Sequence, residues 1–341
     1  MSVTPRPHTT LTQVARAAGV GLATASYALR HDPKIPAATA ARVAAVAERL
    51  GYRPNPRIAA LMTHIRRGRS VPAGERIAFV WPDPLPGDRR PRSVWLDGAR
   101  RRAEQLGYVL EEFFLGANDM TPRRLAGILR ARNITGLVIS PLRAHSSFHL
   151  DWDWSQFSTA IIGNAVSTPE LNHAGHHHFG GMRLALGRLE EAGFRRVAAL
   201  LDEDINERAR RSWSAAFLEH HPNRTGARRF LATTTEANVA AAARRLWKRR
   251  PDALITTLPL LTRLRSVRAE PPAGTKIALL DWQPNSNGWA GIDQCEEVIA
   301  GNAIDLVVGQ LHRNERGVPT HVQMLLFPGI WRNSGDATKT G

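Results

Sequence analysis

Residues 10–56 read TLTQVARAAGVGLATASYALRHDPKIPAATAARVAAVAERLGYRPNP, and their pattern of apolar, capping and glycine residues predicts the fold of the N-terminal part of the chain. A stripe of apolar residues spaced as i, i+3, i+4 and i+7 predicts its first helix, with Leu11, Val14, Ala15 and Ala18 on one face. Thr10 and Gln13 form a capping-box pattern at the start of this helix, and Gly19 ends it.

Two more helices follow within the same stretch. A short one is expected over 22–30, and a longer one runs from Ala37 to Leu50, where Gly51 ends it. The Gly-Val-Gly segment before the second helix is a three-residue turn. Two helices joined by such a turn and supported by a third predict a helix-turn-helix module.

The second helix of a helix-turn-helix enters the major groove of DNA, because the groove admits one helix with its side chains. The contact residues predicted here are Leu22, Ala23, Thr24, Tyr27, Arg30 and Lys34. The first two offer only apolar contacts, for example to a thymine methyl group. Thr24 and Tyr27 can hydrogen-bond base edges or phosphates, and the two cations suit phosphates. The alternative for each is an ordinary exposed helix position.

Positive charge is concentrated in the same part of the chain. The 341 residues carry a formal charge of +16, and residues 1–70 hold eleven basic side chains against only Asp32 and Glu48. Attraction to a phosphate backbone requires such a concentrated basic module. A solvated basic tail is the alternative, but the helical periodicity favours a folded module.

These residues resemble the DNA-binding domain of the LacI/GalR family of transcriptional regulators. The matching elements are L-x-x-V-A-x-x-A-G-V, T-x-S in the second helix, and L-G-Y-x-P-N after the third. The resemblance implies that Thr10, Ser26 and Asn55 also contact DNA. The chain departs from the family at Tyr27, where most members have an arginine that reads guanine, so the operator sequence is left open.

The resemblance also implies a hinge helix over 56–64 that folds in pairs on DNA. Leu61 lies where the family inserts a leucine into the central base step through the minor groove. Taken alone, the segment fits a plain linker equally well.

Residues 76–332 alternate apolar strands with helical stretches. Strands are expected over 76–81, 108–115, 136–141, 159–163, 196–201, 253–256 and 276–282, and helices over 93–106, 121–132, 179–192, 206–220 and 236–247. This alternation predicts parallel sheets with right-handed crossovers. The number of units indicates two α/β lobes, so the fold class is α/β: a small all-α helix-turn-helix domain followed by a two-lobed domain.

The two-lobed region is similar to a type-I periplasmic-binding-protein domain, whose chain crosses between lobes three times. The predicted domains are a helix-turn-helix domain (1–55), a hinge helix and linker (56–75), an effector-binding and dimerisation domain (76–332) and a polar tail (333–341). Ligands of such folds bind beyond the carboxyl ends of the strands.

The resemblance places several residues at the effector site. Arg210 aligns with an arginine that binds effector hydroxyls or carboxylates, and the alternative is a surface charge beside Arg208 and Arg211. Trp282 is expected either to stack on a sugar face or to pack in the core. Asp281 is expected either to accept hydrogen bonds from sugar hydroxyls or to cap a loop.

Three departures from the family favour an anionic effector. Pro91 and Arg92 replace aromatic residues, His177 and His178 replace an Asp-Asn pair, and Gln283 replaces a pocket aspartate. A sugar acid or phosphorylated sugar is therefore the hypothesis, with Arg92, His178, Arg210, Asp281, Trp282 and Gln283 as the candidate binding residues.

Other functional classes lack support in the sequence. Adjacent histidines on an extended segment point to opposite faces, so the cluster from His173 to His178 does not predict a metal site. Nucleotide-binding, hydrolase and zinc-protease motifs are missing, and no cofactor or enzymatic activity is expected. One cysteine, Cys295, and no signal-peptide or membrane-spanning run favour a cytoplasmic, nucleoid-associated bacterial protein that contacts no membrane.

The sequence thus predicts a LacI-like transcriptional regulator, a repressor, that binds a pseudo-palindromic double-stranded DNA operator as a homodimer. A small-molecule effector bound between the lobes would control operator affinity. The alternative is an α/β enzyme or solute-binding protein acting on an acidic metabolite, with an incidental basic N-terminal module.

Overall fold

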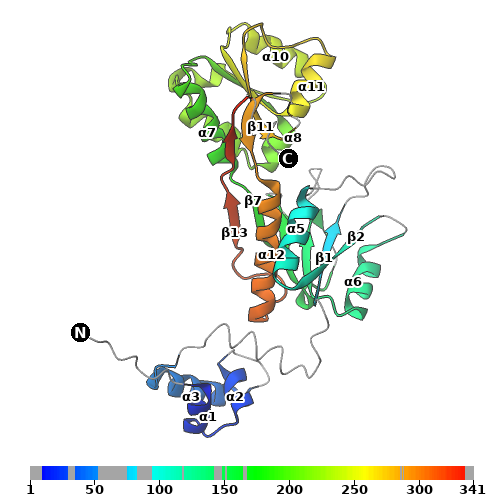
Figure 1. Ribbon diagram of the computed structural model, residues 1–341, viewed down its shortest axis with the longest axis vertical. Helices are drawn as coiled ribbons and strands as arrows, with labels where there is room; N and C mark the ends of the chain where they lie inside the picture. Colours follow the sequence, from blue (N-terminus) through cyan, green and yellow to red (C-terminus); the bar gives the residue numbers. More distant parts are fainter. Residues whose placement is uncertain are drawn as a thin grey trace, which may run out of the picture. The chain divides into compact units, whose positions relative to one another are not determined.

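The computed structural model describes residues 10–29, 35–52, 75–82, 94–116, 119–141, 148–149, 152–163, 167–284, 286 and 288–334 (Figure 1). The chain divides into two compact units, Met1–Val71 and Pro72–Gly341. The predicted hinge helix over 56–64, the linker up to residue 74, and the tail from residue 335 lie outside the described residues.

The described part of the first unit contains three helices, α1 (Leu11–Ala17), α2 (Leu22–Ala28) and α3 (Ala37–Arg49). Val14, Ala25 and Val43, one from each helix, are fully buried at its centre. Gly19 and Gly51 have φ of +64° and +63°, the left-handed conformation that ends a helix at low steric cost. The predicted helix-turn-helix is therefore confirmed, including the capping box at Thr10 and Gln13.

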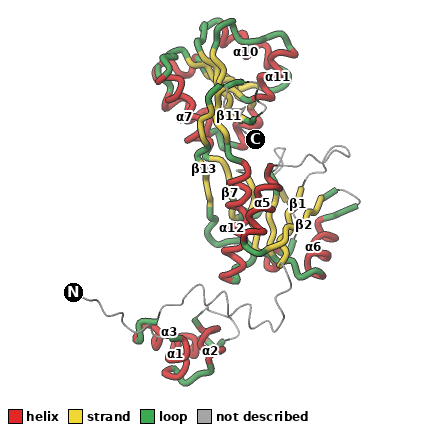
Figure 2. The backbone as a smooth tube through the Cα atoms, in the orientation of Figure 1, coloured by secondary structure: helices red, strands yellow, loops and turns green. Residues whose placement is uncertain are grey.

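The second unit contains two lobes, each built on a six-stranded sheet (Figure 2). The first sheet has the order β13-β7-β5-β3-β1-β2 and is parallel throughout. Its strands are β1 (Glu75–Trp81), β2 (Tyr108–Phe114), β3 (Gly136–Ile139), β5 (Ser158–Ile162), β7 (Asn172–His176) and β13 (Met324–Phe327). A short η1 turn (Trp154–Gln156) and a small two-stranded sheet, β4 (Phe148–His149) with β6 (Ser167–Thr168), accompany it.

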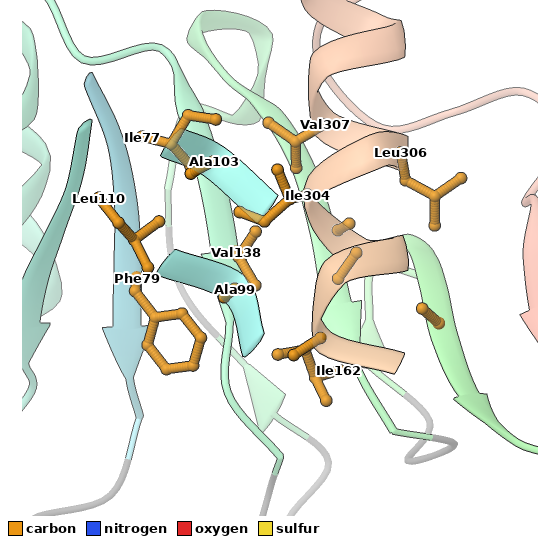
Figure 3. Packing of buried hydrophobic residues seen from close by; sticks show 14 of the residues in the cluster. Ile77, Phe79, Ala99, Ala103, Leu110, Val138, Ile162, Ile304, Leu306 and Val307 are labelled. Carbon is orange, nitrogen blue, oxygen red and sulfur yellow. The ribbon is translucent and has the colours of Figure 1, made fainter. Parts of the chain in front are cut away.

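Helices cover both faces of the first sheet. On one face, α5 (Val94–Gln105) and α12 (Glu296–Arg313) pack on apolar strand residues such as Phe79 and Val138 (Figure 3). On the other face, α6 (Pro122–Ala131) contributes Leu125 and Leu129 to a second cluster. Strand residues alternate between the two clusters, which explains why the strands are apolar almost throughout.

The second sheet has the order β14-β12-β11-β10-β8-β9, and only β14 runs antiparallel. Its strands are β8 (Val197–Asp202), β9 (Leu231–Thr234), β10 (Ala253–Thr256), β11 (Lys276–Trp282), β12 (Ala290–Asp293) and β14 (Ile330–Arg332). The helices α7 (His178–Glu191) and α9 (Ser212–His220) pack on one face, and α10 (Val239–Trp247) and α11 (Leu258–Ser266) on the other. The remaining elements are α8 (Glu203–Arg208) and η2 (Arg224–Arg229).

The chain crosses between the lobes three times: from β7 to α7, from β12 to α12, and from β13 to β14. The third crossing is crowded, because a Cβ on Gly329 would lie 2.9 Å from the His176 ring, the Ile292 side chain and the Asp293 carbonyl oxygen. The two-lobed α/β fold predicted from the sequence is thus confirmed.

One predicted element differs from the structure. The helix expected over 206–220 is two helices, because Arg210 and Arg211 both adopt a left-handed conformation, with φ of +51° and +55°. Two consecutive non-glycine residues in this region are strained, at about 1–2 kcal/mol each. One of the two strained residues, Arg210, is the residue that the sequence places at the effector site.

Candidate functional site

One side of α2 forms an exposed face of the helical unit. Ala25 and Ala28 anchor the opposite side of α2 among α1 and α3. Leu22 and Tyr27 remain 39% and 37% exposed. Ala23 is exposed as well, and Thr24 and Ser26 are partly exposed. The fold therefore brings together these predicted DNA contacts on a convex helix face, where they combine an aromatic hydroxyl, two aliphatic hydroxyls and apolar groups.

Thr10 lies at the start of α1, where its side chain caps the helix. Its Oγ1 accepts a hydrogen bond from the Gln13 N–H at 3.4 Å, and its own N–H donates to Gln13 Oε1 at 2.8 Å. The hydroxyl also donates to Gln13 Oε1 at 3.3 Å, which leaves one lone pair of the exposed oxygen to accept from another group. The other predicted DNA contacts, Arg30, Lys34, Asn55 and Leu61, lie outside the described residues.

The first predicted effector residue, His178, begins α7 at the first crossing. Its ring lies edge-on to those of His176 and Trp213, with centroid distances of 5.0 and 4.8 Å. Burial, reinforced by nearby cationic groups, lowers the pKa of His178 to about 3 and that of His176 to about 4. Both imidazoles are therefore neutral near pH 7, and His178 offers hydrogen-bonding capacity instead of positive charge.

Arg210 lies between α8 and α9 and is paired across the two lobes. Its Nη2 lies 3.5 Å from the carboxylate of Glu170, a residue just before β7, and both side chains are about half exposed. Neighbouring Arg211 pairs with Glu203 and Glu207 at 3.0 and 2.6 Å. Both arginines are thus matched by carboxylates, and Arg210 is the one whose partner comes from the other lobe.

Asp281, Trp282 and Gln283 follow one another at the carboxyl end of β11. The Asp281 carboxylate accepts the Leu258 N–H at 2.8 Å and so caps α11, while burial raises its pKa to about 6. Trp282 is 7% exposed, packs in the core under α10 and α11, and donates its Nε1–H to the Trp289 carbonyl oxygen at 3.0 Å. Gln283 is exposed. The structure thus shows the capping and packing roles that the sequence left as alternatives.

A group of charged residues at the second and third crossings was not identified from the sequence. Arg332 donates from Nε and Nη2 to Asp293 Oδ2 at 3.0 and 2.8 Å, and its guanidinium lies 5.6 Å from the Trp282 ring centroid. Glu296, the first residue of α12, has its pKa raised to about 7 by burial and by the carboxylates of Asp281 and Asp293. Arg332 and Asp293 are 39 residues apart, so only the pairing of β12 with β14 reveals their contact.

Several buried polar atoms of the second lobe have no hydrogen-bond partner among the described residues: Trp213 Nε1, beside the His178 ring, Asn206 Oδ1 and Thr257 Oγ1. They lie on or next to α9, α8 and α11, at the carboxyl-end side of the second sheet. Buried polar groups are nearly always hydrogen-bonded, so unmade bonds of this kind are typical of sites that receive water or ligand groups. Arg92 lies outside the described residues.

The described residues contain no group of three or more His, Cys, Asp or Glu side chains placed to hold a metal ion. No described helix is long and apolar enough to cross a membrane.

Comparison with known proteins identifies relatives of both units. The model of a family described as bacterial regulatory proteins, lacI family, matches residues 10–55. A transcriptional regulator of Pseudomonas plecoglossicida, PtxS, is 29% identical over 225 residues, which are 65% of this chain and 62% of the relative. PtxS of Pseudomonas putida is 30% identical over 57% of this chain and 54% of the relative. The chain therefore matches less than two thirds of the length of these relatives.

Solved structures share the fold along nearly the whole chain. The transcriptional regulator CelR, in a complex with cellobiose, superposes with a TM-score of 0.54 at 20% identity, covering 97% of this chain and all of CelR. The lac repressor dimer, bound to operator and the anti-inducer ONPF, superposes with a TM-score of 0.52 at 17% identity, covering 96% and 99%.

The likeness to these solved structures shows a shared fold, a small helical unit followed by a two-lobed α/β unit. The family match covers the helical unit, residues 10–55, and the likeness to PtxS extends beyond it into the two-lobed unit.

Proposed function

We propose that the protein is a sequence-specific DNA-binding transcriptional regulator, a repressor, that binds a pseudo-palindromic operator as a homodimer. The observation that carries this proposal is the exposed face of α2 within a lacI-family helix-turn-helix, formed by Leu22, Ala23 and Tyr27. The concentration of positive charge in residues 1–70 supports it, because phosphate contacts supply much of the affinity for DNA. The protein would act in the bacterial cytoplasm, at the nucleoid, without a cofactor or an enzymatic step.

Within this proposal, Tyr27 is the main determinant of sequence preference. Its side chain is partly exposed on the helix that would enter the major groove. Thr10, Thr24 and Ser26 would contact phosphates or bases, Arg30, Lys34 and Asn55 phosphates, and Leu61 the central base step through the minor groove.

The two-lobed unit would bind a small-molecule effector, a sugar or sugar acid. The residues proposed to contact it are Arg92, His178, Arg210, Asp281, Trp282 and Gln283. The unmade hydrogen bonds of Trp213, Asn206 and Thr257 support a ligand rich in oxygen atoms. Effector binding would change the arrangement of the lobes and shift the population of DNA-competent dimers, with a coupling of about 1–3 kcal/mol.

An anionic effector is supported by the exposed pair of Arg210 and Glu170. A guanidinium that already faces a carboxylate has the geometry to exchange it for a ligand carboxylate or phosphate. His178 contributes no charge to this attraction, because burial keeps it neutral. The proposed anionic recognition therefore depends on Arg210 and Arg92.

The experiment that tests the regulator function is genome-wide selection of DNA fragments by the purified protein, repeated with Tyr27→Ala and Leu61→Ala. We expect a palindromic site with a flexible pyrimidine–purine step at its centre, bound about 5- to 150-fold more weakly by each variant, since one good base contact contributes about 1–3 kcal/mol. Binding that is non-specific and survives both substitutions would contradict the proposal and favour a metabolite-binding protein.

A further inference from the structure

A group of unpaired cations lies on the second lobe, on the outer face formed by α10 and α11. We call it the cationic surface, and its members are Arg244, Arg245, Lys248, Arg249, Arg250, Arg265 and Arg268. All seven side chains are exposed, and none has an ion-pair partner in the described part of the chain. This distinguishes them from the arginines of the crossings, which face carboxylates.

The fold holds the two halves of the cationic surface together. Helices α10 and α11 pack side by side on one face of the second sheet (Figure 1). The Trp247 Nε1–H donates to the Ala269 carbonyl oxygen at 3.1 Å, which joins the end of α10 to the segment after α11. The cations that follow Ala243 on one helix therefore adjoin those that follow Leu264 on the other.

Few carboxylates lie close enough in sequence to neutralise the cationic surface, and most of these make other interactions. Glu236, which precedes α10, is paired with Arg263 in the last turn of α11. The Asp252 carboxylate accepts the backbone N–H groups of Arg195 and Arg196 at 3.0–3.2 Å. Only Glu270 follows closely in sequence, and it has no ion pair among the described residues.

Helix stability does not account for this arrangement. A cation near a helix C-terminus is favourable, but Arg244 and Lys248 are four residues apart and repel each other on one face. Seven cations at two adjoining helix ends are more than the two helix dipoles can stabilise. A surface of this kind is stabilised by a partner with many negative charges.

We propose that the cationic surface binds the phosphate backbone of duplex DNA without sequence preference, separately from the helix-turn-helix. Six of the seven residues are arginines, whose planar guanidinium matches phosphate oxygens in pairs. An anionic membrane is a poorer partner, because the apolar residues of α10 (Val239, Ala242, Ala243 and Leu246) are buried in the core of the lobe and cannot enter lipid. With the helix-turn-helix on one duplex, this surface would allow the protein to hold a second.

The chain offers an internal probe, since its only lysines are Lys34, Lys248, Lys276 and Lys339. We would acetylate the full-length protein briefly, with and without a random-sequence DNA duplex, and quantify each lysine by mass spectrometry. We expect duplex to slow acetylation of Lys248 severalfold and to leave Lys276, which is hydrogen-bonded to Ser334 at 3.0 Å, unchanged. Lys34 reports the proposed DNA contact of the N-terminal module in the same sample.

A charge-removal pair provides the second measurement. Arg245→Gln/Arg249→Gln should reduce the slope of log affinity against log salt for random duplex by about 1–2, because each neutralised phosphate contributes about 0.9. The matched control, Arg123→Gln/Arg183→Gln, removes two exposed charges from α6 and α7 and should leave the slope unchanged. Glutamine has nearly the helix propensity of arginine, so both variants should fold.

The outcomes separate this inference from the proposed function. Protection of Lys34 without Lys248 would overturn the cationic surface as a DNA site while supporting the helix-turn-helix. Protection of Lys248 without Lys34 would support the surface and count against the helix-turn-helix. Protection of Lys248 by vesicles of phosphatidylserine and phosphatidylcholine, but not by duplex, would overturn the inference in favour of a membrane.

Discussion

At the scale of single residues, burial decides the charge state of the groups around the crossings. Glu296, Asp281 and His178 carry ionisable side chains, yet burial favours the neutral form of each. For the two acids the pKa rises to about 7 and about 6, and for the histidine it falls to about 3. The polar character of the region around the crossings therefore comes mainly from hydrogen-bonding groups and from the arginine–carboxylate pairs.

The raised pKa of Glu296 predicts a pH dependence of stability. Between its ordinary pKa of 4.5 and about 7, the folded protein binds more protons at this site than the unfolded chain, so its contribution falls as pH rises. Glu296→Gln should be more stable than the wild type at pH 8 by about 1–3 kcal/mol, and equal to it near pH 4.5. Urea unfolding at both pH values measures the difference.

The comparison between Glu296→Gln and the wild type is essential to this test. His176 and His178 act in the opposite direction, because their depressed pKa values make the folded state lose stability as pH falls from 6.5 to about 4. Both proteins keep these histidines, so their effect cancels. Equal stabilities at pH 8 would show that Glu296 is not buried beside ionised carboxylates.

At the scale of elements, close approach of helix backbones determines which glycines are replaceable. Gly98 in α5 faces the start of α12, and a Cβ on it would lie 2.4 Å from the Glu297 carbonyl oxygen. Gly127 in α6 is also helical, but a Cβ there would meet nothing within 4 Å. The same residue type therefore has a packing role in one helix and none in the other.

These two glycines give opposite predictions. Gly98→Ala should destabilise the protein by about 1–3 kcal/mol, because α12 must shift away from α5. Gly127→Ala should stabilise it by up to about 1 kcal/mol through helix propensity alone. Thermal unfolding of both variants checks this, and stabilisation by Gly98→Ala would mean that α5 and α12 pack less closely than described.

At the scale of the whole molecule, the pair of Arg210 and Glu170 joins the two lobes. Its groups are half exposed, so the pair itself adds little stability, about 0–1 kcal/mol. A ligand carboxylate would compete with Glu170 for Arg210. If it displaced Glu170, the ion pair between the two lobes would be lost.

This competition predicts that two substitutions have opposite effects on the affinity for anionic ligands. Glu170→Gln should tighten binding of a sugar acid by up to about fivefold, because it removes a competitor worth about 0.2–1 kcal/mol. Arg210→Gln should weaken it by about tenfold or more, since a charged hydrogen bond contributes about 1.5–3 kcal/mol. Thermal-shift titrations with gluconate and galacturonate, and with glucose as the neutral control, measure both. Stabilisation by glucose alone would contradict an anionic effector.

The helical module and the alternation of strands and helices were predictable from the sequence, because capping, periodicity and apolar runs are local properties. Thr10, Gln13 and Gly19 mark the first helix as clearly in the sequence as in the structure. Tertiary structure alone decided that Arg210 interrupts a helix, that Asp281 caps α11, and that Arg332 meets Asp293. Those features depend on contacts between residues far apart in the chain and on the exclusion of water, which no local pattern records.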